Sequence, residues 1–187
     1  NGVASAIPAT LFLFFVADRL RLAPMAGLFL ILYFAAAACS VVPWVAAARS
    51  VGEARAWAGG MLVSALVFVW AFGLGQGDAI AFAAICMLSG FALGADLALP
   101  PALLAGVIAS QGDAGQREAA YFGIWNWGVQ ITLALAAGIS LPMLDWLGYV
   151  PGSNAGTGAL AAAYALLPCV LKLVAAAMLW RAPLRDC

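Results

Sequence analysis

One acidic residue, Asp96, lies in the middle of a long apolar stretch of the chain. An ionisable side chain at that depth of a membrane costs roughly 2.5–3.5 kcal/mol on insertion scales, and it commonly faces a charged partner or a polar cavity. The pair Pro100–Pro101 follows and cannot complete the helical hydrogen-bond ladder, so we expect the helix to break or loosen there. A charge beside broken backbone indicates a solute or ion pathway. A structural acid that is hydrogen-bonded to neighbouring helices fits the same pattern.

A pair of side-chain amides lies inside another apolar segment. Asn126 and Gln130 are four residues apart and share one face of a helix, with Trp125 and Trp127 on either side of Asn126. Amides next to aromatic rings are suited to hydrogen-bond and stack a polar, ring-shaped solute in a lumen. The alternative is hydrogen bonding between helices that holds the bundle together.

Polar residues also lie in the first and last apolar segments. Asn1 and Ser5 are four residues apart and share a face. Tyr164 and Lys172 share a face near the other end of the chain. The long stem of Lys172 allows two outcomes: the ammonium snorkels towards the membrane surface, or it pairs inside the protein, with Asp96 as the natural partner. We take all of these residues as candidates for a substrate site or pathway.

The composition restricts the class of protein. Of the 187 residues, 66% are hydrophobic and 9% are charged, whereas about 25% charged is typical of soluble domains. This predicts an integral membrane protein made of helices. The net charge is zero, so no basic face is available for nucleic acid. The chain has no His, and its four Cys are widely spaced, so no residue set supports an enzyme or a bound metal.

The apolar segments define the expected architecture. Each reaches the roughly 20 residues that are needed to cross a hydrocarbon core. Their expected bounds are about 3–20, 25–47, 57–75, 79–108, 118–144 and 158–180. The predicted fold class is therefore an all-α membrane protein, with six transmembrane helices in one bundle over residues 1–187.

Charge in the connections predicts the orientation. Because six spans place both ends on the same side, the loops after the second and fourth spans lie with the C-terminus. That side carries five arginines: Arg49, Arg55, Arg117, Arg181 and Arg185. The opposite side carries two: Arg19 and Arg21. The positive-inside rule then places the C-terminus in the cytoplasm. Aromatic residues near the span ends are expected in the interfacial belt: Trp44, Trp57, Trp146, Tyr149 and Trp180.

Several stretches, in order along the whole chain, resemble one transporter family. They are NGVASAIPATLFLFFVADRL (Asn1–Leu20), GEARAW (Gly52–Trp57), LGQGD (Leu74–Asp78), GADLALPPALLAGVI (Gly94–Ile108), QREAAYFGIWNWGVQITLALAAGI (Gln116–Ile139), LGYVPG (Leu147–Gly152) and YALLPCVLKL (Tyr164–Leu173). Together they resemble the glycoside-pentoside-hexuronide:cation symporters of the major facilitator superfamily, of which the melibiose carrier is a familiar member. The resemblance implies that this chain is the C-terminal six-helix half of a twelve-helix transporter.

The resemblance also implies a function and partners. The family takes up sugars and glycosides with Na+ or H+ by alternating access, as two six-helix bundles rock around a central site. The implied partners are the lipid bilayer of a bacterial-type inner membrane, an N-terminal six-helix half or a second membrane subunit, and a small polar solute. Asp96 matches the first acid of the family's tenth-helix motif. Gln130 stands where the family typically has Lys, and Gly106 and Ala109 stand where acids are usual.

A second class of function also fits the sequence. A six-helix bundle that has lost coupling charges could serve as a non-transporting transmembrane subunit, an assembly partner in a larger membrane complex. The chain begins inside an apolar segment and without Met, so we expect it to be part of a longer protein. Six further spans ahead of Asn1 would favour transport, and a nearby start codon would favour the subunit or a homodimer.

Overall fold

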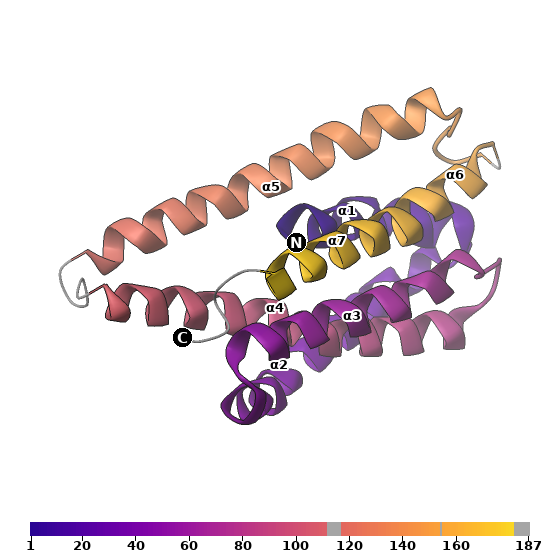
Figure 1. Ribbon diagram of the computed structural model, residues 1–187. Helices are drawn as coiled ribbons and strands as arrows, with labels where there is room; N and C mark the ends of the chain where they lie inside the picture. Colours follow the sequence, from indigo (N-terminus) through magenta and orange to yellow (C-terminus); the bar gives the residue numbers. More distant parts are fainter. Residues whose placement is uncertain (112–116, 154, 182–187) are drawn as a thin grey trace.

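The computed structural model describes residues 1–111, 117–153 and 155–181, and within them every regular element is helical (Figure 1). Arg185, which was counted in the prediction of orientation, lies outside this described part. The elements are α1 (Gly2–Phe14), η1 (Phe15–Arg19), η2 (Ala23–Met25), α2 (Ala26–Val51), α3 (Glu53–Phe72), α4 (Ala79–Ser110), α5 (Glu118–Trp146), α6 (Thr157–Ala161), η3 (Ala162–Leu166) and α7 (Leu167–Arg181).

Six helical stretches are long and apolar enough to cross a membrane. They are Gly2–Arg19, Ala23–Val51, Glu53–Phe72, Ala79–Ser110, Glu118–Trp146 and Thr157–Arg181. This confirms the predicted fold class of an all-α membrane protein with six spans. The assignment of the chain as one C-terminal domain stays a prediction.

The helix α4 passes through its two prolines without interruption. It is a single α-helix from Ala79 to Ser110 that contains both Pro100 and Pro101, so the expected break is not observed. A proline removes only its own N–H from the ladder, which leaves the main-chain carbonyls one turn earlier without their usual donors. Membrane helices tolerate such carbonyls where neighbouring groups satisfy them.

Glycines bring α4 into close contact with α2. Gly90 and Gly94 are four residues apart, so they lie on the same face of α4. A Cβ on Gly94 would lie 2.0 Å from Ser40 Oγ, and one on Gly90 would lie 2.2 Å from the main-chain oxygen of Tyr33. Small residues at this spacing let two helix backbones approach closely in a membrane. This contact therefore fixes the position of the segment that carries Asp96.

Two π-helical turns lie where the first and last spans meet. The turn η1 continues α1, and the turn η3 connects α6 to α7. The rings of Phe15 in η1 and Tyr164 in η3 are stacked, with centroids 4.2 Å apart and planes 9° apart. A π-helical turn accommodates one more residue than an α-helical turn. The stacked rings thus join the two irregular turns.

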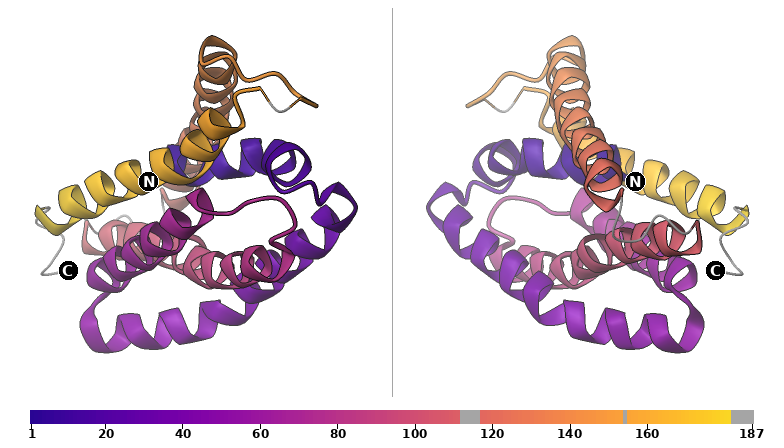
Figure 2. Two further views of the ribbon diagram at one scale, coloured as in Figure 1. Left: turned by 90° about the vertical axis from the view of Figure 1, so that its right-hand side faces the viewer. Right: turned by 90° about the vertical axis from the view of Figure 1, so that its left-hand side faces the viewer.

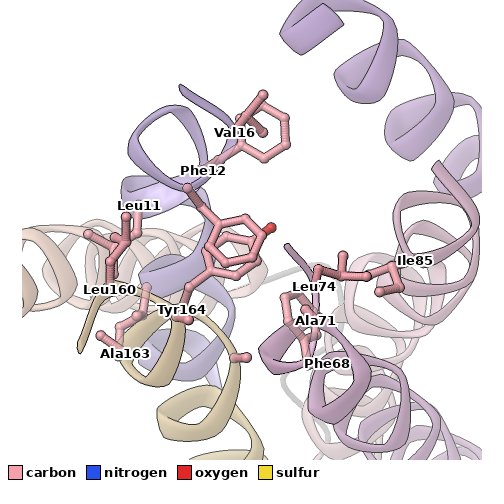
Figure 3. Packing of buried hydrophobic residues seen from close by; sticks show 14 of the residues in the cluster. Leu11, Phe12, Val16, Phe68, Ala71, Leu74, Ile85, Leu160, Ala163 and Tyr164 are labelled. Atoms are coloured by element: carbon pink, nitrogen blue, oxygen red, sulfur yellow. The ribbon is translucent and has the colours of Figure 1, made fainter. Parts of the chain in front are cut away.

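The largest apolar core surrounds these turns. Figure 3 shows Phe12 of the first span and Tyr164 of the last span on one side of this core, with Phe68 and Ala71 of α3 on the other. Because lipid is as apolar as these side chains, packing contacts rather than the hydrophobic effect stabilise this core.

The helix α5 stands apart from most of the bundle. It packs mainly on α1, and in both views of Figure 2 it lies at the end of the molecule opposite α2. In the most apolar part of the span that contains α5, 17% of the residues are buried, and the share is the same for the span that contains α2. In the first span the share is 50%. The described chain therefore leaves both helices broadly open to lipid or to a partner.

Polar contacts tie together the connections at one end of the bundle. Asp18 accepts hydrogen bonds from the Tyr149 hydroxyl and from the Gly152 N–H, the latter at 3.0 Å. Arg19 Nε donates to the main-chain oxygen of Leu74 at 3.0 Å. Tyr149 is only 5% exposed, because its hydroxyl is directed inward to Asp18; its place in an interfacial belt stays a prediction.

Candidate functional site

The centre of the site is a buried ion pair between α4 and α7. Lys172 Nζ lies 2.8 Å from Asp96 Oδ2, and the two side chains are 4% and 11% exposed respectively. The Lys172 ammonium therefore does not snorkel to the membrane surface. It takes the other expected course and neutralises Asp96 inside the bundle.

The Asp96 carboxylate accepts three further hydrogen bonds. Asn1 Nδ2 and Trp57 Nε1 donate to Oδ1 at 2.7 and 2.8 Å, and Ser5 Oγ donates to Oδ2 at 3.1 Å. Hydrogen bonds to an ionised acceptor are stronger than those between neutral groups. Both oxygens of Asp96 are thus held in fixed directions by α1, α3 and α7.

The Lys172 ammonium also has a hydrogen-bond partner for each of its donors. It donates to Asp96 Oδ2 at 2.8 Å, to Ser5 Oγ at 3.0 Å and to Asn1 Oδ1 at 3.1 Å. An ammonium has three N–H donors, so this geometry uses all of them. We call these five side chains the Asp96 cluster: Asn1, Ser5, Trp57, Asp96 and Lys172.

Local sequence explains how the helices position the cluster. Asn1 is the N-cap residue of α1 and Ser5 lies four residues later, so both side chains reach the same side. Gly60 packs on α4 so closely that an added Cβ would lie 2.5 Å from Ala95 Cβ. Since Trp57 lies almost one turn before Gly60, this contact brings its indole within reach of Asp96.

A small cavity adjoins the ion pair. Its lining combines hydroxyl groups with aromatic and apolar side chains: Ser5, Pro8, Tyr33, Ser64, Phe68, Ser89, Leu93, Asp96 and Lys172. Its volume is about 20 Å³, which is room for about one water molecule. Ligand sites for small molecules commonly have about 300–1,000 Å³. This conformation of the described residues is therefore closed around the ion pair and does not admit a sugar ring.

The structure brings together four of the candidate residues: Asn1, Ser5, Asp96 and Lys172. Tyr164 is not among them, because it is buried in the apolar core against Phe15. It lies eight residues before Lys172, which is roughly 12 Å along a helix. Tyr164 thus shares a helix face with Lys172, as predicted, but lies too far along the span to reach the Asp96 cluster.

The amide pair of α5 also lies away from the cluster. Asn126 and Gln130 are exposed on α5, and Trp125 and Trp127 are 38% and 69% exposed. The described residues build no lumen over this face. Their expected role in a solute pathway stays a prediction that requires a further surface opposite α5.

Sequence reasoning missed several polar members of the site. Trp57 was expected in the interfacial belt, but its indole N–H points inward to Asp96. Tyr33, Ser64 and Ser89 line the cavity and were not singled out. The available signal was a polar group inside an apolar span, the same signal that identified Ser5.

The described residues contain no group of three or more His, Cys, Asp or Glu side chains placed to hold a metal ion. The candidate site consists of the Asp96–Lys172 ion pair with amide, hydroxyl and indole partners. In this conformation the charged groups of the site are satisfied by one another.

Comparisons with known proteins identify the family. The model of the MFS/sugar transport protein family matches residues 1–186. The comparisons with curated proteins and with solved structures gave no match. A match over almost the whole length, together with six helices long enough to span a membrane, indicates a multi-pass membrane protein of a transporter family. The chain belongs to the MFS/sugar transport protein family.

Proposed function

We propose that this chain is the C-terminal six-helix bundle of a transporter that moves a sugar or glycoside by alternating access, within the glycoside-pentoside-hexuronide:cation symporter group. The observation that carries the proposal is the Asp96 cluster, a closed, charge-neutral network across α1, α3, α4 and α7. Such a network makes four spans one body. Alternating access requires bodies of this kind, which rock against a second bundle.

The exposed face of α5 supports a solute pathway. A side-chain amide in hydrocarbon without hydrogen-bond partners costs several kcal/mol, so the face with Asn126 and Gln130 is poorly suited to lipid. It is suited to a polar lumen closed by an N-terminal bundle. Trp125 and Trp127 beside the amides offer flat rings, and a sugar presents an apolar ring face with hydroxyls at its edge.

The orientation belongs to the same proposal. The C-terminus lies in the cytoplasm and the chain resides in a bacterial-type inner membrane. The excess of arginine on the side of Arg49, Arg55 and Arg117 supports this orientation. The contacts between Asp18 and Tyr149 then lie on the opposite side, where they close the outer end of the bundle.

The test is sugar counterflow by the intact protein in proteoliposomes. We expect the double variant N126A/Q130A to insert normally and to lose uptake. The matched control is L135A/I139A, which removes two exposed apolar side chains of α5 (47% and 52% exposed) at the same spacing and retains uptake.

Two results would contradict the proposal. Uptake by N126A/Q130A at the wild-type rate would remove these amides from the pathway. A wild-type protein that inserts but carries none of a panel of mono- and disaccharides would favour the alternative function, a transmembrane subunit of a larger complex.

A further inference from the structure

The ammonium of Lys172 lies where a bound cation would lie. We propose that the Asp96 cluster is a monovalent-cation site that the protein fills with its own Lys172, so that removal of this ammonium creates an Asp96-dependent site for an alkali-metal ion. The proposal rests on the proposed transport function in one respect: in a protein without the ammonium, such a site would add a coupling ion to this bundle. The binding measurement itself does not depend on transport.

The oxygen atoms around Lys172 Nζ form a ligand set for a hard cation. They are a carboxylate oxygen of Asp96, an amide oxygen of Asn1 and a hydroxyl oxygen of Ser5, at 2.8, 3.1 and 3.0 Å. Hard cations select such oxygen ligands over nitrogen or sulfur. All three atoms come from α4 and from the start of the first span, where Asn1 is the N-cap of α1 and Ser5 lies within it. The cage therefore does not need α7 except for the ammonium.

Other contacts hold this cage in place. Asn1 Nδ2 and Trp57 Nε1 both donate to Asp96 Oδ1, which leaves Oδ2 directed at the ammonium. Ser5 Oγ donates to the same Oδ2 while it accepts from Lys172. The carboxylate, amide and hydroxyl thus remain fixed by one another when the ammonium is absent.

The charge balance explains why a metal ion is excluded while Lys172 is present. The charges of Asp96 and Lys172 sum to zero, and their side chains are only 11% and 4% exposed. An added metal ion would leave one unpaired positive charge in a poorly polarisable region, which is strongly unfavourable. Without the ammonium, the imbalance is reversed: the buried Asp96 carboxylate is unpaired, and a monovalent cation restores neutrality. The adjacent cavity, with room for about one water and with Ser64 and Ser89 on its walls, provides space for one water ligand of the ion.

The experiment compares the intact wild-type protein with K172M and D96N/K172M in detergent. Methionine keeps an unbranched chain without the charge, and the double variant also removes the carboxylate. Each protein is titrated with NaCl, KCl and LiCl at ionic strength held constant with choline chloride. Thermal unfolding is measured together with tryptophan fluorescence, because the indole of Trp57 contacts Asp96 directly.

We expect K172M to gain a saturable rise in unfolding temperature and a fluorescence change with at least one of these ions. We expect neither the wild type nor D96N/K172M to show this saturable rise and fluorescence change. A response that all three proteins share comes from ion binding outside the Asp96 cluster. A K172M response no larger than that of D96N/K172M would overturn the proposal. So would an equal Asp96-dependent response in the wild type.

A second measurement covers a K172M protein that does not survive purification in choline chloride. Recovery of folded K172M is then compared in membranes solubilised in NaCl, KCl or LiCl and in choline chloride alone. Ion-dependent recovery supports the site, and equal loss in all of these media overturns it. In proteoliposomes, K172M uptake gains ion dependence if the proposed function also holds. Ion binding without any uptake by the wild type would reject the transport function and leave the cation site standing.

Discussion

The Asp96–Lys172 pair is best tested by a double-mutant cycle on stability. The variants are D96N, K172M and D96N/K172M. We expect each single variant to lose about 3–5 kcal/mol, the typical cost of leaving one charge of a buried pair uncompensated. The double variant contains no unpaired charge, so it should lose clearly less than the sum of the two single losses.

The structure sets the size of the expected coupling. At the observed 2.8 Å, two unit charges attract each other by about 6 kcal/mol at an effective dielectric constant of about 20. Desolvation of both groups offsets much of this attraction, so the pair itself contributes little net stability. The loss in K172M should lie near the lower end of the range, because Asn1, Ser5 and Trp57 still donate to Asp96. We therefore expect a coupling free energy of about 3 kcal/mol.

The assay is reversible unfolding of the intact protein in mixed micelles, followed by far-ultraviolet circular dichroism, in choline chloride so that no alkali-metal ion interferes. The matched control is a cycle with two exposed apolar residues on the same helices, L97A and V174A, which are 55% and 52% exposed. Additive losses in the Asp96–Lys172 cycle, as expected for the control pair, would refute the buried ion pair.

Three further perturbations test other parts of the structure. Gly94→Val should force α4 away from α2 and lower both stability and uptake, because even a Cβ meets a neighbouring oxygen at 2.0 Å; normal unfolding temperature and normal uptake would contradict this close contact. Trp57→Phe should keep most of the packing but remove one hydrogen bond to Asp96, which predicts a loss of about 1.5–3 kcal/mol in unfolding free energy; an unchanged value would show that the indole bond contributes nothing. Burial, together with the hydrogen bond to Asp18, raises the pKa of Tyr149 above its usual value of about 10. The neutral phenol therefore stabilises the fold at lower pH, this stability falls as the pH rises above about 10, and Tyr149→Phe should flatten the fall in an unfolding series across that pH range; the same slope in both proteins would exclude Tyr149 as its cause.

The fold was predictable because its signal is local and long. Each span is a run of apolar residues whose length must match the membrane, and no tertiary information is needed to recognise it. Asp96 and Lys172 were recognisable for a related reason: a charge inside such a run is rare and needs a partner. Their direct contact was one of two outcomes that the sequence left open, and only the packing of α7 beside α3 and α1 decided it.

Other features depend on tertiary contacts that a periodic pattern does not contain. Trp57 lies near the start of α3, where its indole could face the membrane surface or form a hydrogen bond inside the bundle. The close Gly60–Ala95 contact brings the indole within reach of Asp96. The helix through Pro100 and Pro101 stays unbroken, although the two residues predict a break, because each proline removes only its own N–H from the ladder. The exposure of Asn126 could not be read from its helix face, since the described chain supplies no surface opposite it.

The two π-helical turns have a consequence for the comparison of relatives. Each holds one surplus residue, and they lie in the two spans that carry Ser5 and Lys172. A relative with an ordinary α-helical turn in place of η3 would be one residue shorter there. If the two sequences were aligned without a gap, every later position would be offset by one, which is about 100° around a helix. Residues equivalent to Lys172 would then be sought on the wrong side of the last span, so the gap must be placed within 162–166 before a lysine is judged present or lost.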